Sequence, residues 1–125
     1  MRRVLLAIAI ACSALAPLSL RAEEAPDEHV IRQWAEALND HRFATRQSAM
    51  RQLVRAGAPS VPVVISACQS NDRETAERAF EVLYRLSVAD DQVARRSARS
   101  ALEKLSTSST NEVARMARRA MREGR

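Results

Sequence analysis

The sequence predicts an all-α fold, a short stack of about six helices arranged as three pairs. Glycine and proline are scarce in the 125-residue chain, with two and four copies, and few residues are aromatic. Apolar residues recur three and four positions apart, which is the spacing of one helix face, and no long strand-like alternation is sustained. One short pattern of small and large apolar residues also recurs four times, which is typical of helical repeats.

The first 22 residues predict a secretory signal peptide, because a basic start precedes an apolar run to Leu20 and Ala22 offers a cleavage site. Two alternatives stay open. One is a lipoprotein signal that ends at Cys12, and the other is an uncleaved anchor, although Pro17 leaves that run marginal for crossing a bilayer. We therefore expect export to the periplasm, the cell envelope or the medium, or lipid anchoring at Cys12, and no transmembrane span in the mature chain.

Residues 23–27 are acidic around Pro26 and predict a mobile lead-in to one helical domain over residues 28–123. The first helix of that domain is expected to begin at Asp27 or Glu28 and to end before Asn39-Asp40. Its apolar face is formed by Val30, Ile31, Trp34, Ala35 and Leu38.

A second helix is expected over residues 42–55, and Gly57 suits the left-handed residue that often follows a helix. Pro59 and Pro62 bracket the start of a third helix, where a missing amide costs little. This third helix is expected to run to about Gln69.

The clearest helical signal covers residues 71–86. Asp72 is a favourable N-cap because its carboxylate can accept hydrogen bonds from first-turn amides. The apolar face of this fourth helix is formed by Ala76, Ala79, Phe80, Leu83 and Leu86. A fifth helix is expected after a cap at Asp90-Asp91, and a sixth over residues 112–122 after a cap at Thr110 or Asn111.

Four segments share one frame, in which a small or β-branched residue is followed by alanine four positions on and by a large apolar residue four positions further. These positions lie on one helix face, so the alanine lets a neighbouring helix come close and the large residue fills the seam. The expected repeat core is Ala49 and Leu53, Ala79 and Leu83, Ala98 and Leu102, and Ala117 and Met121. The alanines are 30, 19 and 19 residues apart, so the third copy could be either member of a helix pair.

Recurring turn residues accompany these frames. They are Asn39-Asp40 before Phe43-Ala44-Thr45-Arg46, Gly57-Ala58-Pro59-Ser60-Val61-Pro62, Asn71-Asp72-Arg73-Glu74 and Glu112-Val113-Ala114-Arg115. With these motifs, residues 30–122 resemble HEAT repeats, the helix-turn-helix units of α-solenoids. The chain departs from that family where Thr75 and Ala94 replace the usual valine and where the spacing shortens after Leu86, so a compact six-helix bundle stays an alternative. The resemblance implies an extended surface for protein partners.

Few residues suggest a catalytic or metal-binding site. His29 and His41 lie near opposite ends of the first helix, so they do not form a metal-ligand pair. Cys68 lies on an apolar stripe and is expected to be a buried, inert thiol, with intermolecular pairing as the alternative. The sequence shows no nucleophile motif and no glycine-rich phosphate loop. We therefore expect no enzyme activity, no cofactor and no metal.

Charge is distributed unevenly along the chain. Residues 23–91 carry 8 basic and 12 acidic side chains, whereas residues 92–125 carry 9 basic and 3 acidic ones. The basic third predicts a partner-binding face made of Arg95, Arg96, Arg99, Arg115, Arg118, Arg119 and Arg122. A solvated end face that keeps the last repeat soluble is the alternative. Nucleic acid is disfavoured as a partner, because the net charge after residue 22 is small and export removes most such targets.

These observations predict a non-catalytic exported module that offers a helical-repeat surface to a protein partner, as an interaction or scaffold platform. The alternative is a basic helical module that binds an anionic surface, either lipid headgroups or an acidic polymer, through its C-terminal arginines. No motif identifies the protein partner.

Overall fold

Six α-helices in three successive pairs make up the part of the chain that the computed structural model describes, residues 25–125. The predicted signal peptide over residues 1–22, including Cys12, lies outside the described residues. The pairs are α2 (Glu28–Ala37) with α3 (Phe43–Ala56), α4 (Val61–Cys68) with α5 (Arg73–Ser87), and α6 (Gln92–Ser106) with α7 (Asn111–Glu123). The predicted all-α fold, a short helical stack, is confirmed.

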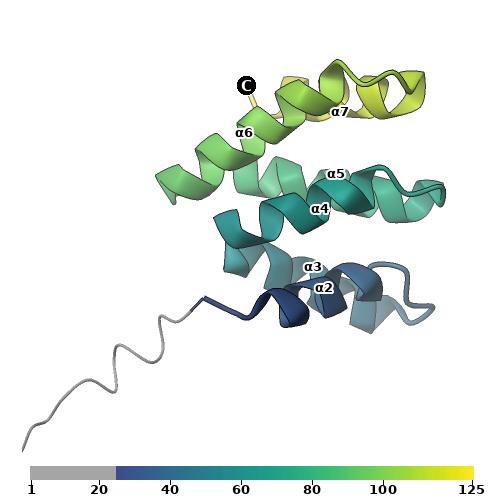
Figure 1. Ribbon diagram of the computed structural model, residues 1–125, viewed down its shortest axis with the longest axis vertical. Helices are drawn as coiled ribbons and strands as arrows, with labels where there is room; N and C mark the ends of the chain where they lie inside the picture. Colours follow the sequence, from purple (N-terminus) through teal and green to yellow (C-terminus); the bar gives the residue numbers. More distant parts are fainter. Residues whose placement is uncertain (1–24) are drawn as a thin grey trace, which may run out of the picture.

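The helices form two layers, with α2, α4 and α6 in one layer and α3, α5 and α7 in the other (Figure 1). Each helix packs on its pair mate and on its neighbours in the same layer. Three of the four sequence frames lie in α3, α5 and α7, and the remaining frame lies in α6. The third copy is therefore the first member of its pair, which explains why its alanine is only 19 residues from the next one.

Side-chain caps account for two of the six helix starts in the described residues. The carboxylate of Asp27 accepts from the amide of His29 at 3.3 Å, and that of Asp91 accepts from the amide of Val93 at 3.0 Å. Asp72 also holds the N-cap position, but no first-turn amide donates to its side chain.

The Asp72 carboxylate accepts instead from the hydroxyl of Thr75 at 2.5 Å, and this hydrogen bond lowers its pKa. Asp72 is therefore the N-cap residue of α5, as expected, with the Thr75 hydroxyl as the donor to its carboxylate. Thr110 is likewise the N-cap residue of α7 but makes no side-chain capping bond.

The turn between α3 and α4 depends on Gly57 and Ser60. Gly57 has φ +72°, a conformation that side chains with a Cβ disfavour. A short 3₁₀ turn, η1 (Ala58–Ser60), follows it. The buried hydroxyl of Ser60 lies 2.9 Å from the carbonyl oxygen of Leu53 and 2.8 Å from that of Gly57, so it satisfies acceptors at the end of α3.

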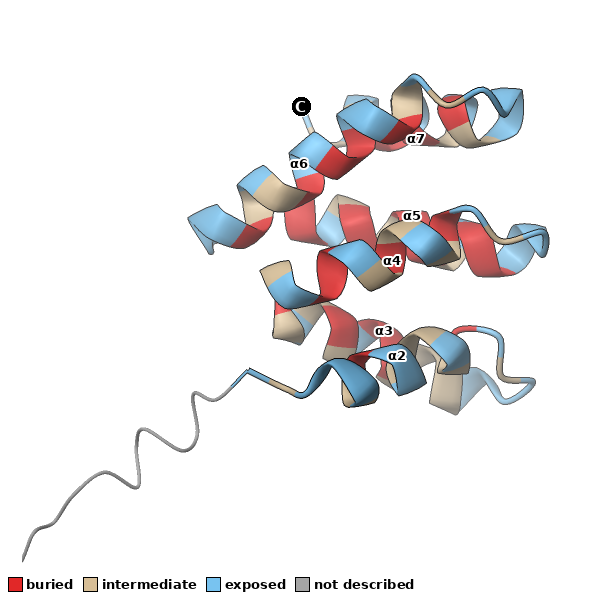
Figure 2. Cartoon of the chain, viewed as in Figure 1, coloured by how far each residue is buried: buried red, intermediate tan, exposed pale blue. Residues whose placement is uncertain are grey.

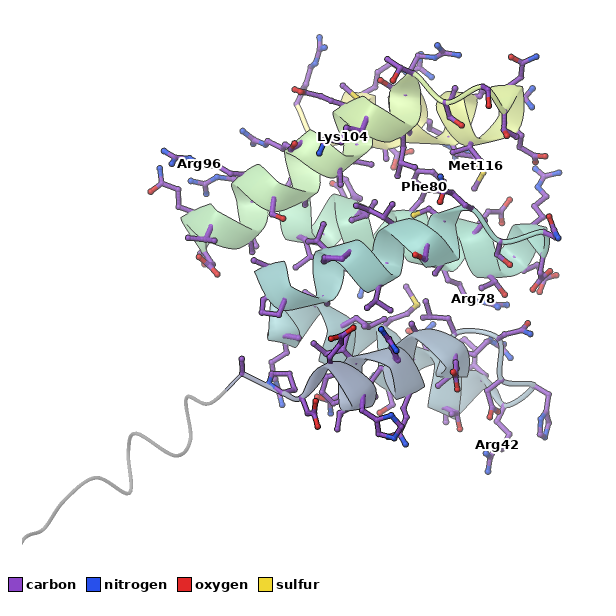
Figure 3. All side chains as sticks on the ribbon, in the orientation of Figure 1. Arg42, Arg78, Phe80, Arg96, Lys104 and Met116 are labelled. Atoms are coloured by element: carbon purple, nitrogen blue, oxygen red, sulfur yellow. The ribbon has the colours of Figure 1, made fainter. Side chains whose placement is uncertain are left out.

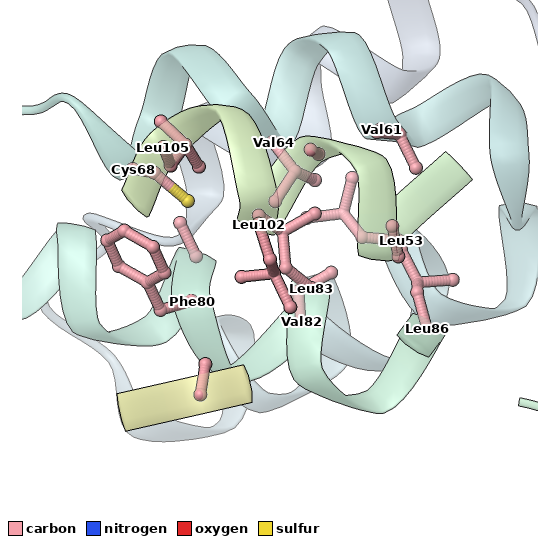
Figure 4. Close-up of a cluster of buried hydrophobic side chains, with 14 of the residues drawn as sticks. Leu53, Val61, Val64, Cys68, Phe80, Val82, Leu83, Leu86, Leu102 and Leu105 are labelled. Atoms are coloured by element: carbon pink, nitrogen blue, oxygen red, sulfur yellow. The ribbon is translucent and has the colours of Figure 1, made fainter. Parts of the chain in front are cut away.

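The buried side chains run through the middle of the stack, between the two layers (Figure 2). Helix α5 contributes the most of them, including Phe80, Val82, Leu83 and Leu86 (Figure 4). Seven of the eight expected repeat-core residues are buried, namely Ala49, Leu53, Ala79, Leu83, Ala98, Leu102 and Ala117, whereas Met121 is half-buried. No helix in the described part of the chain is both long and apolar enough to cross a membrane.

Candidate functional site

The seven arginines predicted as a partner-binding face do not form one surface. On α6, the guanidinium of Arg95 donates to the carbonyl of Ala89 at 3.0 Å, and that of Arg99 donates to the carbonyl of Ser87 at 3.2 Å. Both arginines therefore hold the turn that joins α5 to α6. Arg96 is exposed near the start of α6 (Figure 3).

The four arginines of α7 divide between two sides of that helix. Arg115, Arg119 and Arg122 line a groove of about 660 Å³ between α5 and α7. Arg118 is exposed on α7 and does not line the groove. The groove lies on the layer formed by α3, α5 and α7, which is one long side of the stack.

Apolar side chains form the floor of this α5–α7 groove. Phe80 and Tyr84 come from α5, and Met116 and Ala120 come from α7. Phe80 and Met116 lie between the two helices (Figure 3), where Phe80 is buried and Met116 is half-buried. The Tyr84 hydroxyl lies 3.5 Å from the carbonyl oxygen of Glu123, at the far end of the groove.

Eight charged side chains surround this floor: Arg73, Arg115, Arg119, Arg122, Glu77, Glu81, Glu112 and Glu123. At one end, the Nε of Arg73 lies 2.9 Å from a carboxylate oxygen of Glu77 and 3.7 Å from one of Glu112. Arg73 therefore joins the start of α5 to the start of α7 and closes that end of the groove.

Two of the groove arginines have no carboxylate beside them. The remaining groove glutamates are paired, Glu81 with Arg85 at 3.0 Å and Glu123 with Arg119 at 3.2 Å. Within residues 25–125, no carboxylate lies within ion-pair distance of Arg115 or Arg122. Both are exposed, so two positive charges on the rim are available to a bound molecule.

On the side of α5 that faces the first helix pair, a polar link joins α5 to the end of α2 and the turn after it. Arg78 of α5 donates to the carbonyl of Leu38 at 2.8 Å, and the Thr75 hydroxyl lies 3.2 Å from the side-chain oxygen of Asn39. In the repeat frame, the position of Arg78 corresponds to Met116 of α7. At this position α7 therefore has the thioether of Met116, whereas α5 has the guanidinium of Arg78.

The other residues singled out in the sequence do not gather at this groove. His29 and His41 are exposed near opposite ends of α2, and no group of three metal-ligating side chains is found among the described residues. Cys68 is fully buried, and burial raises the pKa of its thiol. Asp40, in the turn after α2, has its pKa lowered to about 2 by hydrogen bonds from the side chain and amide of Arg42.

A second hollow of about 700 Å³ lies in the other layer, between α2 and α4. Its lining includes Ala35, Pro62, Val63 and Ala67. Of its charged residues, Glu28 and Arg32 pair with each other, and Glu36 is exposed. This hollow lacks the aromatic floor of the α5–α7 groove. The α5–α7 groove is the better candidate for a binding site because it combines an aromatic floor with two available positive charges.

Sequence reasoning identified the arginines of α7 but missed the rest of the groove. Phe80 was expected only as core, and Tyr84, Met116 and the groove glutamates come from segments about 30 residues apart. The only signal that Tyr84 and Met116 share in the sequence is an apolar residue beside the buried face of a helix, and this signal is weak. Comparison of this chain with protein-family models, with curated proteins and with solved structures finds no match.

Proposed function

We propose that this chain is a non-catalytic, exported interaction module of the HEAT-like type, which binds a segment of a protein partner in the α5–α7 groove. The observation that carries the proposal is the groove itself, with an apolar floor and a charged rim on one long side of a helical stack. Apolar floors supply affinity for a protein segment, and a charged rim supplies orientation.

Three further features support this proposal. The repeat frames resemble those of HEAT repeats, whose stacks present extended surfaces to protein partners. The basic start and apolar run of the first 22 residues support export. The buried thiol and the scattered histidines favour a binding role over a catalytic one, because each lies apart from the groove.

Site-specific photo-crosslinking in the native cells tests the proposal. A photoreactive phenylalanine analogue replaces Arg119, which lines the groove, or its neighbour Arg118, which does not. We expect a discrete protein adduct from position 119 and little from position 118. Equal adducts from both positions, or none from either, would contradict binding in the groove.

A second candidate function is binding to an anionic surface, either lipid headgroups or an acidic polymer. It is favoured by the exposure of Arg115, Arg118 and Arg122 along α7. On this alternative, Arg118→Glu weakens binding to anionic vesicles as much as Arg115→Glu does, because a flat surface contacts both. On the groove proposal, the chain does not bind such vesicles.

A further inference from the structure

We infer that the α5–α7 groove accepts an amphipathic helix of a protein partner that carries two carboxylates about two helical turns apart, with apolar residues between them. This inference rests on the proposed function and specifies the chemistry of the partner. It follows from the charges that the groove leaves available, from their spacing, and from the floor between them.

The available charge selects an acidic occupant. Glu81 and Glu123 each pair with an arginine of their own, whereas Glu77 and Glu112 share Arg73, so three arginines pair with the four glutamates of the rim. Arg115 and Arg122 have no such partner within residues 25–125. A partner with carboxylates at these two points gains charge-assisted hydrogen bonds, whereas a basic partner meets like charge.

The spacing suits a helix. Arg115 and Arg122 are seven residues apart on α7, which places them on the same side of the helix and about 10 Å apart along its axis. A helix that lies alongside α7 presents its own residues i and i+7 at the same interval. Its carboxylates at i and i+7 can then face the two guanidinium groups together.

The floor selects the residues between those carboxylates. Met116 and Tyr84 are half-buried and lie in the groove, so apolar side chains at i+3 and i+4 of the occupant would cover them. Met116 is flexible and polarizable, and methionine is frequent on surfaces that adapt to a bound helix. The corresponding position of α5 does not offer this floor, because it is occupied by Arg78.

Selection from a displayed peptide library tests the inference. The library consists of helix-favouring peptides of about 15 residues, randomised on one face, and is selected against the folded chain lacking residues 1–22. We expect enriched peptides to carry Asp or Glu at i and i+7 with apolar residues at i+3 and i+4. Binding of these peptides should weaken as salt rises, because exposed ion pairs are screened.

Charge reversal supplies the decisive comparison. The double variant Arg115→Glu, Arg122→Glu should lose binding of the acidic peptides by about tenfold or more, and should select Lys or Arg at the same spacing. The matched control Arg118→Glu changes the same charge on the same helix outside the groove and should leave the acidic selection unchanged. Circular dichroism checks that each variant is folded, and a double Gln variant replaces the Glu variant if it is not.

Three results would overturn the inference. They are the absence of an acidic i, i+7 motif from the wild-type selection, persistence of that motif in the double variant, and equal loss in the Arg118→Glu control. The crosslinking experiment is independent of these results. An adduct at position 119 without the acidic motif would leave the groove as a protein-binding site and reject only the proposed chemistry of its partner.

Discussion

Leu83→Ala is the most direct test of the packing described above. Leu83 is 0 % exposed and belongs to the same buried cluster as Val64 of α4 and Leu102 of α6 (Figure 4). Truncation removes apolar contacts and leaves a cavity, which for a fully buried leucine costs about 3 kcal/mol of the free energy of unfolding. At about 4 °C per kcal/mol for a domain of this size, the melting temperature should fall by about 12 °C.

Urea and thermal unfolding followed by far-UV circular dichroism measure this change. Val93→Ala is the matched control, because Val93 is 66 % exposed on α6 and its truncation should change stability by less than about 0.5 kcal/mol. The reasoning is refuted if Leu83→Ala lowers the melting temperature by no more than the control does. In that case the buried face of α5 would have been assigned incorrectly.

Three other substitutions probe the fold. Ala79→Arg places a long charged side chain at a site with 0 % exposure, so the near-UV spectrum should lose its native features; a native-like spectrum would argue against close packing there. Gly57→Ala should lower the free energy of unfolding in urea by about 1–2 kcal/mol, because the φ of +72° is unfavourable for alanine. The added Cβ itself has room, since its nearest neighbour, Asp91 Oδ2, lies 3.6 Å away. An unchanged free energy of unfolding would mean that the turn relaxes. Arg42→Ala should raise the pKa of Asp40 from about 2 toward 3.8 in an NMR titration. Because folding lowers this pKa, the stability it contributes is complete above about pH 4 and is lost as the pH falls toward 2; an unchanged pKa would remove Arg42 as its cause.

The helices were predictable from the sequence because their signals are local. The expected first helix ended at Leu38, and α2 ends at Ala37 with Leu38 as its cap. The expected face of the fourth helix, including Ala79 and Phe80, is buried in α5. Periodicity and capping residues encode such features within a few positions, so they need no knowledge of the neighbouring helices.

The functions of individual arginines were not predictable, because they depend on tertiary neighbours. Arg99 and Arg115 both lie on basic stretches of predicted helices and look equivalent in the sequence. In the structure, Arg99 donates to the carbonyl of Ser87, whereas Arg115 lines the α5–α7 groove. Likewise, the recurring sequence pattern does not show whether Ala98 lies in the first or the second helix of its pair, because small residues suit both helices.

Small residues along α7 have a consequence for the order in which the stack opens. Its buried residues are Ala114, Ala117 and Ala120, and its larger apolar side chains are only half-buried. An alanine methyl removes little apolar surface from water, so α7 gains less from burial than α5 does. Local opening of α7 should therefore need less free energy than global unfolding, and its amides should exchange with deuterium sooner than those of α5. Of the two walls of the groove, α7 is thus easier to detach than α5, and a bound partner helix would stabilise α7 and slow the exchange of its amides.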